Sequence, residues 1–570
     1  MPLKKPEFIG KLLLDKGLIT IEDLEQALLA QGKSGLPLGA TLISSGCLSE
    51  DKFYRALSEQ FGLAYLKLKN LQIPPAVIEQ IPARISTHYK LIPISFENNL
   101  LTVAASNPPD INTLDELKLM LKKDIKVALA SEADIISAMR QYYGVGAETI
   151  EKITPQALTP EAVDLSTQSA EDLIKPTDDA SIIKFVNQIL LEAHKDRATD
   201  IHIEPYYDEL RIRYRIDGIL YDTKLPPNIK NFQSAIISRV KIMANLNIAE
   251  KRLPQDGRIK IKISQDEVDL RVSILPTPFG EAVVIRLLST NIFYGLENLG
   301  LLKSDLGLFE KLIRQPHGII FVTGPTGSGK TTTLYAALNK INDSEKKILT
   351  IEDPIEYQLK GITQIQVHPK IGLSFSNGLR AMLRHDPDIM MVGEVRDYET
   401  AEITIRVALT GHLVFSTLHT NDAAGGITRL IDMGVEPFLV ASSVIAFVAQ
   451  RLVRVICPDC KSEFKPQKEV LSELGLSPKD LLGVKVYQGK GCDSCKHTGY
   501  KGRTAIYEIL AVNEPIRELI LKRASTEQIK KKAISLNMHT LRQDGWEKVI
   551  RGITTPSEVI RVTQKEEPST

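Results

Sequence analysis

The sequence predicts an α/β protein made of several domains. Its 570 residues are too many for one compact core, and 43% hydrophobic with 25% charged residues is the balance of folded, soluble chains. An apolar strand over residues 319–323 runs into a glycine-rich loop and then a helix, the local order of a parallel α/β sheet. A second helix from Ile182 is followed by several alternating strands. These patterns together predict separate α/β domains.

The charge balance and the cysteines limit where the protein acts. The 71 lysines and arginines nearly cancel the 70 acids, which argues against a nucleic-acid partner. Lys11 and Asp15 interrupt the apolar N-terminal stretch, so no export signal is expected. Four of five cysteines form C-x-x-C pairs, as in a metal site of a reducing compartment, and Cys47 is expected to be a small core residue. We therefore expect a cytoplasmic protein.

The apolar stretch 438–449 is too short to span a bilayer and is predicted to be a buried helix.

The first 143 residues predict an interaction module. IGKLLLDKGLITIEDLEQALLAQ from Ile9 is repeated as LGATLISSGCLSEDKFYRALSEQ from Leu38. Each copy predicts a short helix, a glycine stop, a Thr20 or Ser49 cap and an amphipathic helix, and an α/β half follows to residue 143. Residues 144–181 are rich in Pro, Ser and Thr and predict a flexible linker. We expect further domains over residues 182–290 and 291–570.

The segment GPTGSGKT fits the Walker A pattern G-x-x-x-x-G-K-[ST] between a strand and a helix. Glycines let backbone amides close around the β-phosphate, Lys330 supplies a positive charge and Thr331 binds magnesium. The motif thus predicts ATP and Mg²⁺ as cofactors. The residues predicted to bind nucleotide are Gly324, Pro325, Thr326, Gly327, Ser328, Gly329, Lys330, Thr331 and Thr332.

Acidic segments supply the remaining candidates. The strand of LRHDPDIMMVGEVRD is predicted to lie beside the Walker A strand and to present Glu394 to magnesium or its water shell. Hydrolysis needs a carboxylate that orients the attacking water, and either Glu394 or Glu356 of TIEDPIE is suited; TIEDPIE is alternatively a helix cap or surface loop. His412 and His419 in TGHLVFSTLHTND are phosphate sensors or hydrogen-bonding core residues.

These four segments resemble the Walker A, Asp box, Walker B and His box of the secretion ATPase superfamily, in the family's order. The resemblance implies a PAS-like domain over residues 182–290 and a RecA-like ATPase domain over residues 291–570. It also implies a homohexameric ring with nucleotide between the two domains. Arg271 and Arg286 would then reach the phosphates. The residues implied near the subunit junction are Arg380, Arg384 and Arg396.

Cys457, Cys460, Cys492 and Cys495 have the spacing of a structural zinc ribbon that closes the insert 457–495. The chain resembles assembly ATPases of type IV pili and type II secretion in this insert, whereas retraction ATPases lack it. The resemblance implies a type IV pilus assembly ATPase that drives an inner-membrane platform protein. A type II secretion ATPase is the alternative, and a DNA-translocating ATPase is a more distant one.

The N-terminal repeat resembles modules that bind cyclic di-GMP, in which an arginine precedes the first Leu-Gly. Here Phe8 and Pro37 stand at those positions. Their identity argues against dinucleotide binding and favours docking to other assembly proteins.

Overall fold

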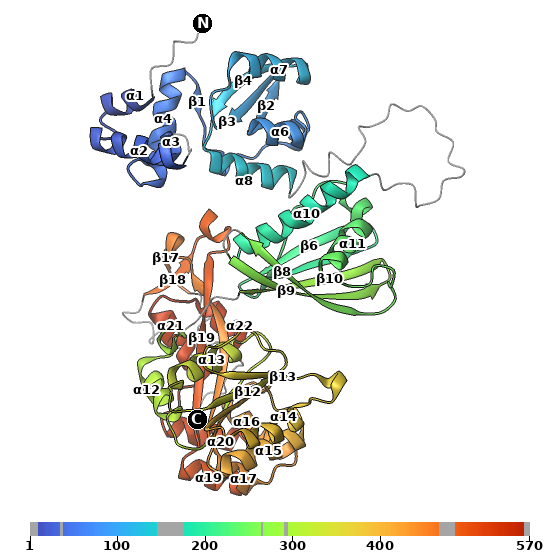
Figure 1. Ribbon diagram of the computed structural model, residues 1–570. Helices are drawn as coiled ribbons and strands as arrows, with labels where there is room; N and C mark the ends of the chain where they lie inside the picture. Colours follow the sequence, from blue (N-terminus) through green and yellow to red (C-terminus); the bar gives the residue numbers. More distant parts are fainter. Residues whose placement is uncertain are drawn as a thin grey trace. The chain divides into compact units, whose positions relative to one another are not determined.

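A computed structural model describes residues 9–34, 38–144, 176–263, 266–289, 295–466 and 485–563. The chain divides into two compact units, Met1–Leu288 and Ser289–Thr570 (Figure 1). Most of the predicted linker, residues 145–175, lies outside the described residues. Helix α10 begins at Pro176, earlier than the predicted Ile182, and proline is well tolerated in a first helical turn.

The N-terminal repeat forms two helix pairs, as the sequence predicts. Gly17 and Gly46 occupy matching positions and both have positive φ, 64° and 77°, which ends the first helix of each pair. The Thr20 hydroxyl accepts the N–H of Asp23 at 3.1 Å, so this cap is present, whereas the Ser49 side chain makes no cap bond. Leu13 and Leu42 are fully buried between the pairs. The helices are α1 (Ile9–Asp15), α2 (Ile21–Ser34), α3 (Leu38–Ser44) and α4 (Glu50–Phe61).

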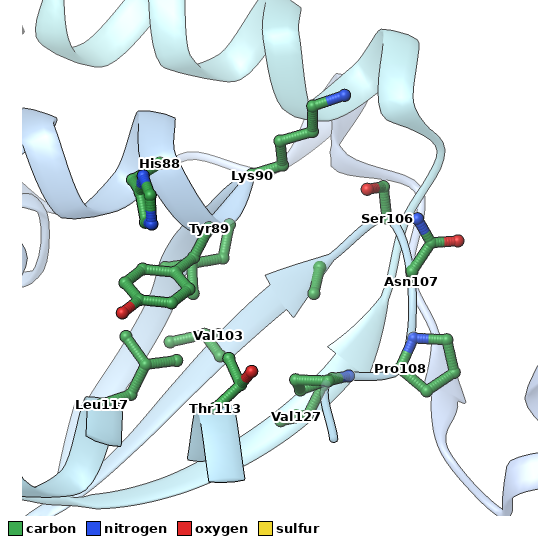
Figure 2. Close-up of a pocket in the computed structure, with 13 residues that line it drawn as sticks. His88, Tyr89, Lys90, Val103, Ser106, Asn107, Pro108, Thr113, Leu117 and Val127 are labelled. Carbon is green, nitrogen blue, oxygen red and sulfur yellow. The ribbon is translucent and has the colours of Figure 1, made fainter. Parts of the chain in front are cut away.

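The α/β half of this module has a four-stranded sheet in the order β1-β4-β3-β2. Its strands are β1 (Ala64–Tyr65), β2 (Leu91–Glu97), β3 (Leu100–Ala105) and β4 (Asp124–Leu129). Its helices are α5 (Pro75–Ile78), α6 (Ala83–Tyr89), α7 (Ile111–Leu121) and α8 (Glu132–Tyr143). A pocket of about 220 Å³ opens beside the end of β3, with Ser106 and Asn107 at one side and Tyr89 and Leu117 at the other (Figure 2).

The rest of the first unit is a six-stranded sheet with helices packed on one face. The sheet order is β7-β6-β5-β10-β9-β8, and buried residues of α10 and α11 share one core with it. On the opposite face Arg213 makes two hydrogen bonds to Glu204, at 2.8 and 2.9 Å. The helices are α10 (Pro176–Lys195) and α11 (Gln233–Met243). The strands are β5 (Ala198–Pro205), β6 (Leu210–Ile216), β7 (Ile219–Asp222), β8 (Gln255–Ile263), β9 (Asp266–Thr277) and β10 (Gly280–Ser289).

The second unit is built on a seven-stranded sheet in the order β13-β12-β14-β15-β11-β16-β19. The strands from β13 to β16 run parallel, and β19 pairs antiparallel with β16. The strands are β11 (Gly318–Thr323), β12 (Ile348–Glu352), β13 (Thr363–Gln366), β14 (Ile389–Val392), β15 (Leu413–Leu418), β16 (Val444–Ile456) and β19 (Tyr500–Ala511). Buried residues fill both faces of the sheet, as expected for parallel strands.

Helices cover this sheet (Figure 1). They are α12 (Lys303–Leu312), α13 (Lys330–Ile341), α14 (Phe375–Met382), α15 (Tyr398–Leu409), α16 (Ala423–Asp432), α17 (Pro437–Ser443), α19 (Glu514–Leu521), α20 (Thr526–Ser535), α21 (Leu541–Ile550) and α22 (Pro556–Val562). A two-stranded ribbon of β17 (Lys461–Phe464) and β18 (Val486–Gly489) extends from the unit, and residues 467–484 of the predicted insert lie outside the described part. The predicted α/β multidomain class is confirmed.

Two sequence expectations about this unit are wrong. The Walker B strand β14 is not beside the Walker A strand β11, because β15 lies between them. The apolar stretch 438–449 is not one helix: α17 ends at Ser443 and β16 begins at Val444. The β-branched Val444, Ile445 and Val448 favour a strand. Pairing of this segment with β11 in the interior of the sheet stabilises the strand over a helix. Across the described residues, every helix is too short or too polar to cross a membrane.

Candidate nucleotide site and four-cysteine cluster

The Walker A loop lies between β11 and α13, at the carboxyl end of the sheet. Gly324, Gly327 and Gly329 have φ of 151°, 79° and 88°, so the loop needs glycine at all three positions. A Cβ on Gly324 would lie 2.6 Å from the Gln450 carbonyl, and one on Gly329 would lie 2.8 Å from the Gln450 amide. The loop is therefore packed tightly against β16, and its amides surround the start of a helix, where phosphate binds favourably.

Two polar side chains of the Walker A loop, those of Lys330 and Ser328, are placed where they can bind a phosphate. Lys330 donates to the carbonyls of Gly324 and Pro325 at 2.8 and 3.1 Å, so its ammonium is folded back over the loop. Burial lowers the pKa of Lys330 to about 8; the Glu394 carboxylate opposes this shift and the Arg451 guanidinium adds to it. The Ser328 hydroxyl is buried and finds no hydrogen-bond partner within the described residues. These residues fit a nucleotide phosphate, which would accept bonds from both side chains.

Glu394 follows β14 and reaches the same edge of the sheet. Its side chain is only 11% exposed, its Oε1 lies 2.5 Å from Nη2 of Arg396, and its Oε2 lies 3.4 Å from Nε2 of His419. His419 follows β15, which pairs with both β11 and β14. Because parallel strands end together, Glu394 and His419 reach the phosphate loop even though β14 is not adjacent to β11.

The Asp box follows β12, the next strand along this edge. Glu352 is buried at the end of the strand, and Glu356 is half-buried in the loop that follows. Burial raises the pKa of the Glu352 carboxyl, and hydrogen bonds from Thr350, Tyr335 and Gln364 oppose that rise. TIEDPIE is therefore a strand end and a structured loop, and its acids lie at the edge that carries the Walker A loop.

Other predicted residues lie elsewhere. His412 precedes β15 at the opposite end of a six-residue strand, about 20 Å from that strand's carboxyl end, and its Nδ1 contacts the Val407 carbonyl at 2.9 Å. The structure thus does not group His412 with His419. Arg286 belongs to the first unit, where its Nε donates to Asp200 at 3.0 Å, and Arg271 lies on β9 of that unit. Arg380 pairs with Glu399 at 2.8 Å, and Arg384 donates to the Arg380 carbonyl.

Sequence reasoning missed Gln450 and Arg451, which lie against the loop from β16. Arg451 is 8% exposed, and it donates to the carbonyls of Gln450 and Asn421 at 3.0 and 2.8 Å. It thereby joins the phosphate loop to the segment after His419. The available signal was the Gln450-Arg451 pair, which interrupts the apolar run 444–453, because a charged residue in a buried strand is rare unless its charge is paired.

The four cysteines Cys457, Cys460, Cys492 and Cys495 form one cluster whose sulfurs all lie within 4.8 Å of one another. Three of the Sγ–Sγ distances are 3.8, 3.8 and 3.7 Å, far longer than a disulfide. Four sulfurs placed tetrahedrally at the usual Zn–S distance of about 2.3 Å would be about 3.8 Å apart. The N–H groups of Cys492 and Gly499 donate to Cys495 Sγ at 3.2 and 3.3 Å, and such bonds stabilise a metal-bound thiolate. The geometry fits a tetrahedral metal ion.

Comparison with known proteins supplies the family. Residues 175–561 match the family described as Type II/IV secretion system protein, and residues 61–149 match the MshEN domain. The chain is 43% identical over 559 residues to the type IV pilus assembly ATPase PilB of Myxococcus xanthus, covering 97% of this chain and 98% of that one. It is 41% identical over 561 residues to type II secretion system protein E of Xanthomonas campestris pv. campestris, covering 98% of each. The chain belongs to the Type II/IV secretion system protein family and is an ATP hydrolase of that family.

Proposed function

We propose that this chain is the motor of type IV pilus assembly: a homohexamer that hydrolyses ATP and drives an inner-membrane platform protein from the cytoplasm. The observation that carries the proposal is one sheet edge that bears the Walker A loop, Glu394, His419 and the Asp box together. The pilus assembly ATPase of Myxococcus xanthus supports the biological role through similarity along nearly the whole chain.

Each residue of that edge has a role in phosphoryl transfer. The amides of the loop and Lys330 bind the β- and γ-phosphates, while Thr331 and Glu394 would hold Mg²⁺. Bound magnesium would neutralise charge on the phosphates. Glu356 orients the attacking water, and His419 holds Glu394 in place through the 3.4 Å contact.

Arg271 and Arg286 of the PAS-like domain, residues 182–290, act on the phosphates of ATP during hydrolysis by the ATPase domain, residues 291–570. Charge grows on the transferring phosphoryl group, and guanidinium groups stabilise it. Residues 1–143 dock to other assembly proteins.

The four cysteines hold one structural zinc ion. A closed set of four thiolates leaves no open position for chemistry, so the metal orders the insert 457–495 rather than taking part in hydrolysis. The insert packs near α21 and α22, where Val486 shares a small core with Val549 and Val559. The described part of the insert is therefore continuous with the C-terminal helices.

A type II secretion ATPase is the second candidate, supported by the similarity to the Xanthomonas campestris protein. Deletion of the gene, with complementation by the wild type or Lys330→Ala, separates the two. The proposal predicts loss of surface pili with normal secretion of exoproteins, restored by the wild type alone. Loss of secretion with intact pili would establish the second candidate. Salt-sensitive DNA binding by the purified chain would instead favour a DNA translocase.

A further inference from the structure

A buried tyrosine joins the Walker A helix to the Asp box. Tyr335 lies on α13, five residues after Lys330, and is only 1% exposed. Its hydroxyl donates to Glu352 Oε2 at the end of β12. Glu352 Oε1 accepts from the Thr350 hydroxyl at 2.6 Å and from the Gln364 amide at 3.1 Å. The buried carboxylate thus has three side-chain donors, from α13, β12 and β13.

The same hydroxyl also holds the loop that follows Glu352. The backbone N–H of Glu356 donates to Tyr335 Oη at 3.4 Å, and the ring of Tyr357 packs edge-on against the Tyr335 ring at 4.6 Å. Gln364 fixes the far end of the loop, because its Nε2 donates to the Tyr357 carbonyl at 3.2 Å and its Oε1 accepts the Leu359 N–H at 2.7 Å. The loop 353–359 is therefore held near both ends, by Tyr335 and by Gln364, and we call these two side chains the clamp.

The clamp depends on the hydroxyl and not only on the ring. A tyrosine hydroxyl donates one hydrogen bond and accepts others, so it can serve Glu352 and Glu356 at once, whereas phenylalanine can serve neither. Removing the hydroxyl takes away one of the three side-chain donors to the buried Glu352 carboxylate. It also removes the acceptor of the Glu356 backbone N–H. The ring volume, and with it the packing against Tyr357, is retained.

We propose that Tyr335 is a positioning residue for hydrolysis, which fixes Glu356 relative to the phosphate-binding residues at the start of the same helix. The inference rests on the proposed role of Glu356 in orienting water. Lys330 and Thr331 begin α13, and Tyr335 is in its second turn, so one rigid element sets the distance between phosphate and carboxylate. A displacement of about 1 Å in such a constellation is enough to cost about 100-fold in rate.

The chain offers a matched control in Tyr507. This tyrosine is also 1% exposed, and its hydroxyl lies 3.2 Å from the Thr333 hydroxyl of α13. It belongs to β19, at the sheet edge opposite β13, and so is remote from the Asp box. Tyr335→Phe and Tyr507→Phe each remove one buried hydroxyl that connects α13 to another part of the sheet or its loops. A general loss of stability would affect both variants alike.

The experiment measures kcat, KM for ATP and MgADP affinity for wild type, Tyr335→Phe, Tyr507→Phe, Glu356→Gln and the double variant Tyr335→Phe/Glu356→Gln. We expect Tyr335→Phe to lower kcat by about tenfold or more while KM and MgADP affinity change less than about threefold. Tyr507→Phe should stay within about threefold of wild type in all three quantities. In the Glu356→Gln background, Tyr335→Phe should cause no further loss, because the residue it positions is already disabled.

Two results overturn the inference while the role of Glu356 stands: wild-type kcat in Tyr335→Phe, or equal fold-losses from Tyr335→Phe with and without Glu356. Wild-type kcat in Glu356→Gln overturns the role of Glu356 and the inference with it. If Tyr335→Phe does not fold, Gln364→Met replaces it, because it removes the other side of the clamp from a half-buried position. We then expect Gln364→Met to lower kcat when Glu356 is present and to cause no further loss in the Glu356→Gln background.

Discussion

The carboxylate of Glu394 lies between two basic side chains, with Arg396 Nη2 at 2.5 Å and His419 Nε2 at 3.4 Å. The acid is held at the sheet edge that carries the phosphate loop, although its strand is separated from β11 by β15. Two contacts on one carboxylate fix its direction better than one, which suits a group that must hold a metal or its water shell in a set position.

Glu394→Gln should therefore bind ATP but hydrolyse it slowly. The substitution keeps the size of the side chain and removes the negative charge that magnesium or its water shell requires. We expect kcat to fall by about 100-fold, with nucleotide affinity nearly unchanged. Nucleotide binding titrations beside single-turnover rates make the comparison, and a variant that hydrolyses at the wild-type rate would remove Glu394 from the site.

Nucleotide affinity should depend on pH through Lys330, whose pKa is lowered by burial to about 8 in the free protein. Below that pH the ammonium already carries its proton, and affinity should be flat. Above that pH most Lys330 side chains are neutral, and each must take up a proton before it can pair with phosphate. Nucleotide affinity should therefore fall by up to about tenfold per pH unit. Calorimetry in buffers of different ionisation enthalpy should show proton uptake on binding above about pH 8. Constant affinity from about pH 7 to about pH 9.5 would contradict the lowered pKa.

Arg271 and Arg286 should contribute to hydrolysis more than to ADP binding. Neither the γ-phosphate nor the transition-state charge is present in ADP, so removing a guanidinium that acts on them leaves ADP affinity intact. We expect Arg271→Gln and Arg286→Gln each to lower kcat by about 100-fold and ADP affinity by less than about threefold. Arg213→Gln is the control, because it removes an ion-paired arginine from the same sheet, as Arg286→Gln does. Equal losses in turnover and ADP binding would indicate a structural role for the two arginines.

Metal analysis of the purified chain should find one zinc ion, lost in Cys457→Ser and Cys492→Ser and retained in Cys47→Ser. Cys47 packs in the N-terminal core and is a cysteine outside the cluster, so it controls for thiol loss. Loss of the metal should disorder the insert, because thiolate ligation supplies much of its folding free energy. Nucleotide binding should persist. Metal-free wild-type protein with an ordered insert, by hydrogen exchange, would disprove the zinc assignment.

The sequence was most informative where chemistry is local. The Walker A loop follows from eight consecutive residues, and the two C-x-x-C pairs indicate a common ligand set although 31 residues separate Cys460 from Cys492. Strand order is not local, which is why β14 was wrongly expected beside β11. The segment 438–449 was misassigned for the same reason, since its periodicity fits a buried helix as well as a buried strand.

Arg451 and Tyr335 were not predicted because their roles come from tertiary contacts. In the sequence, Tyr335 is one of several core positions in the helix after Lys330. Only the tertiary fold brings its hydroxyl to Glu352 and Glu356. Arg451 lies more than a hundred residues from the loop it supports. Motif spacing identifies residues that touch the nucleotide, whereas residues that support them are distributed over several strands.

Steady-state ATP hydrolysis by purified wild type and Lys330→Ala shows whether the Walker A loop is the site of hydrolysis. The Lys330 ammonium bonds to the Gly324 carbonyl within the Walker A loop, and the Glu394 carboxylate acts on its charge. We expect turnover in the wild type and a loss of about 100-fold or more in Lys330→Ala, with unchanged thermal stability. Equal turnover in the two proteins would contradict the assignment of this loop as the site of hydrolysis.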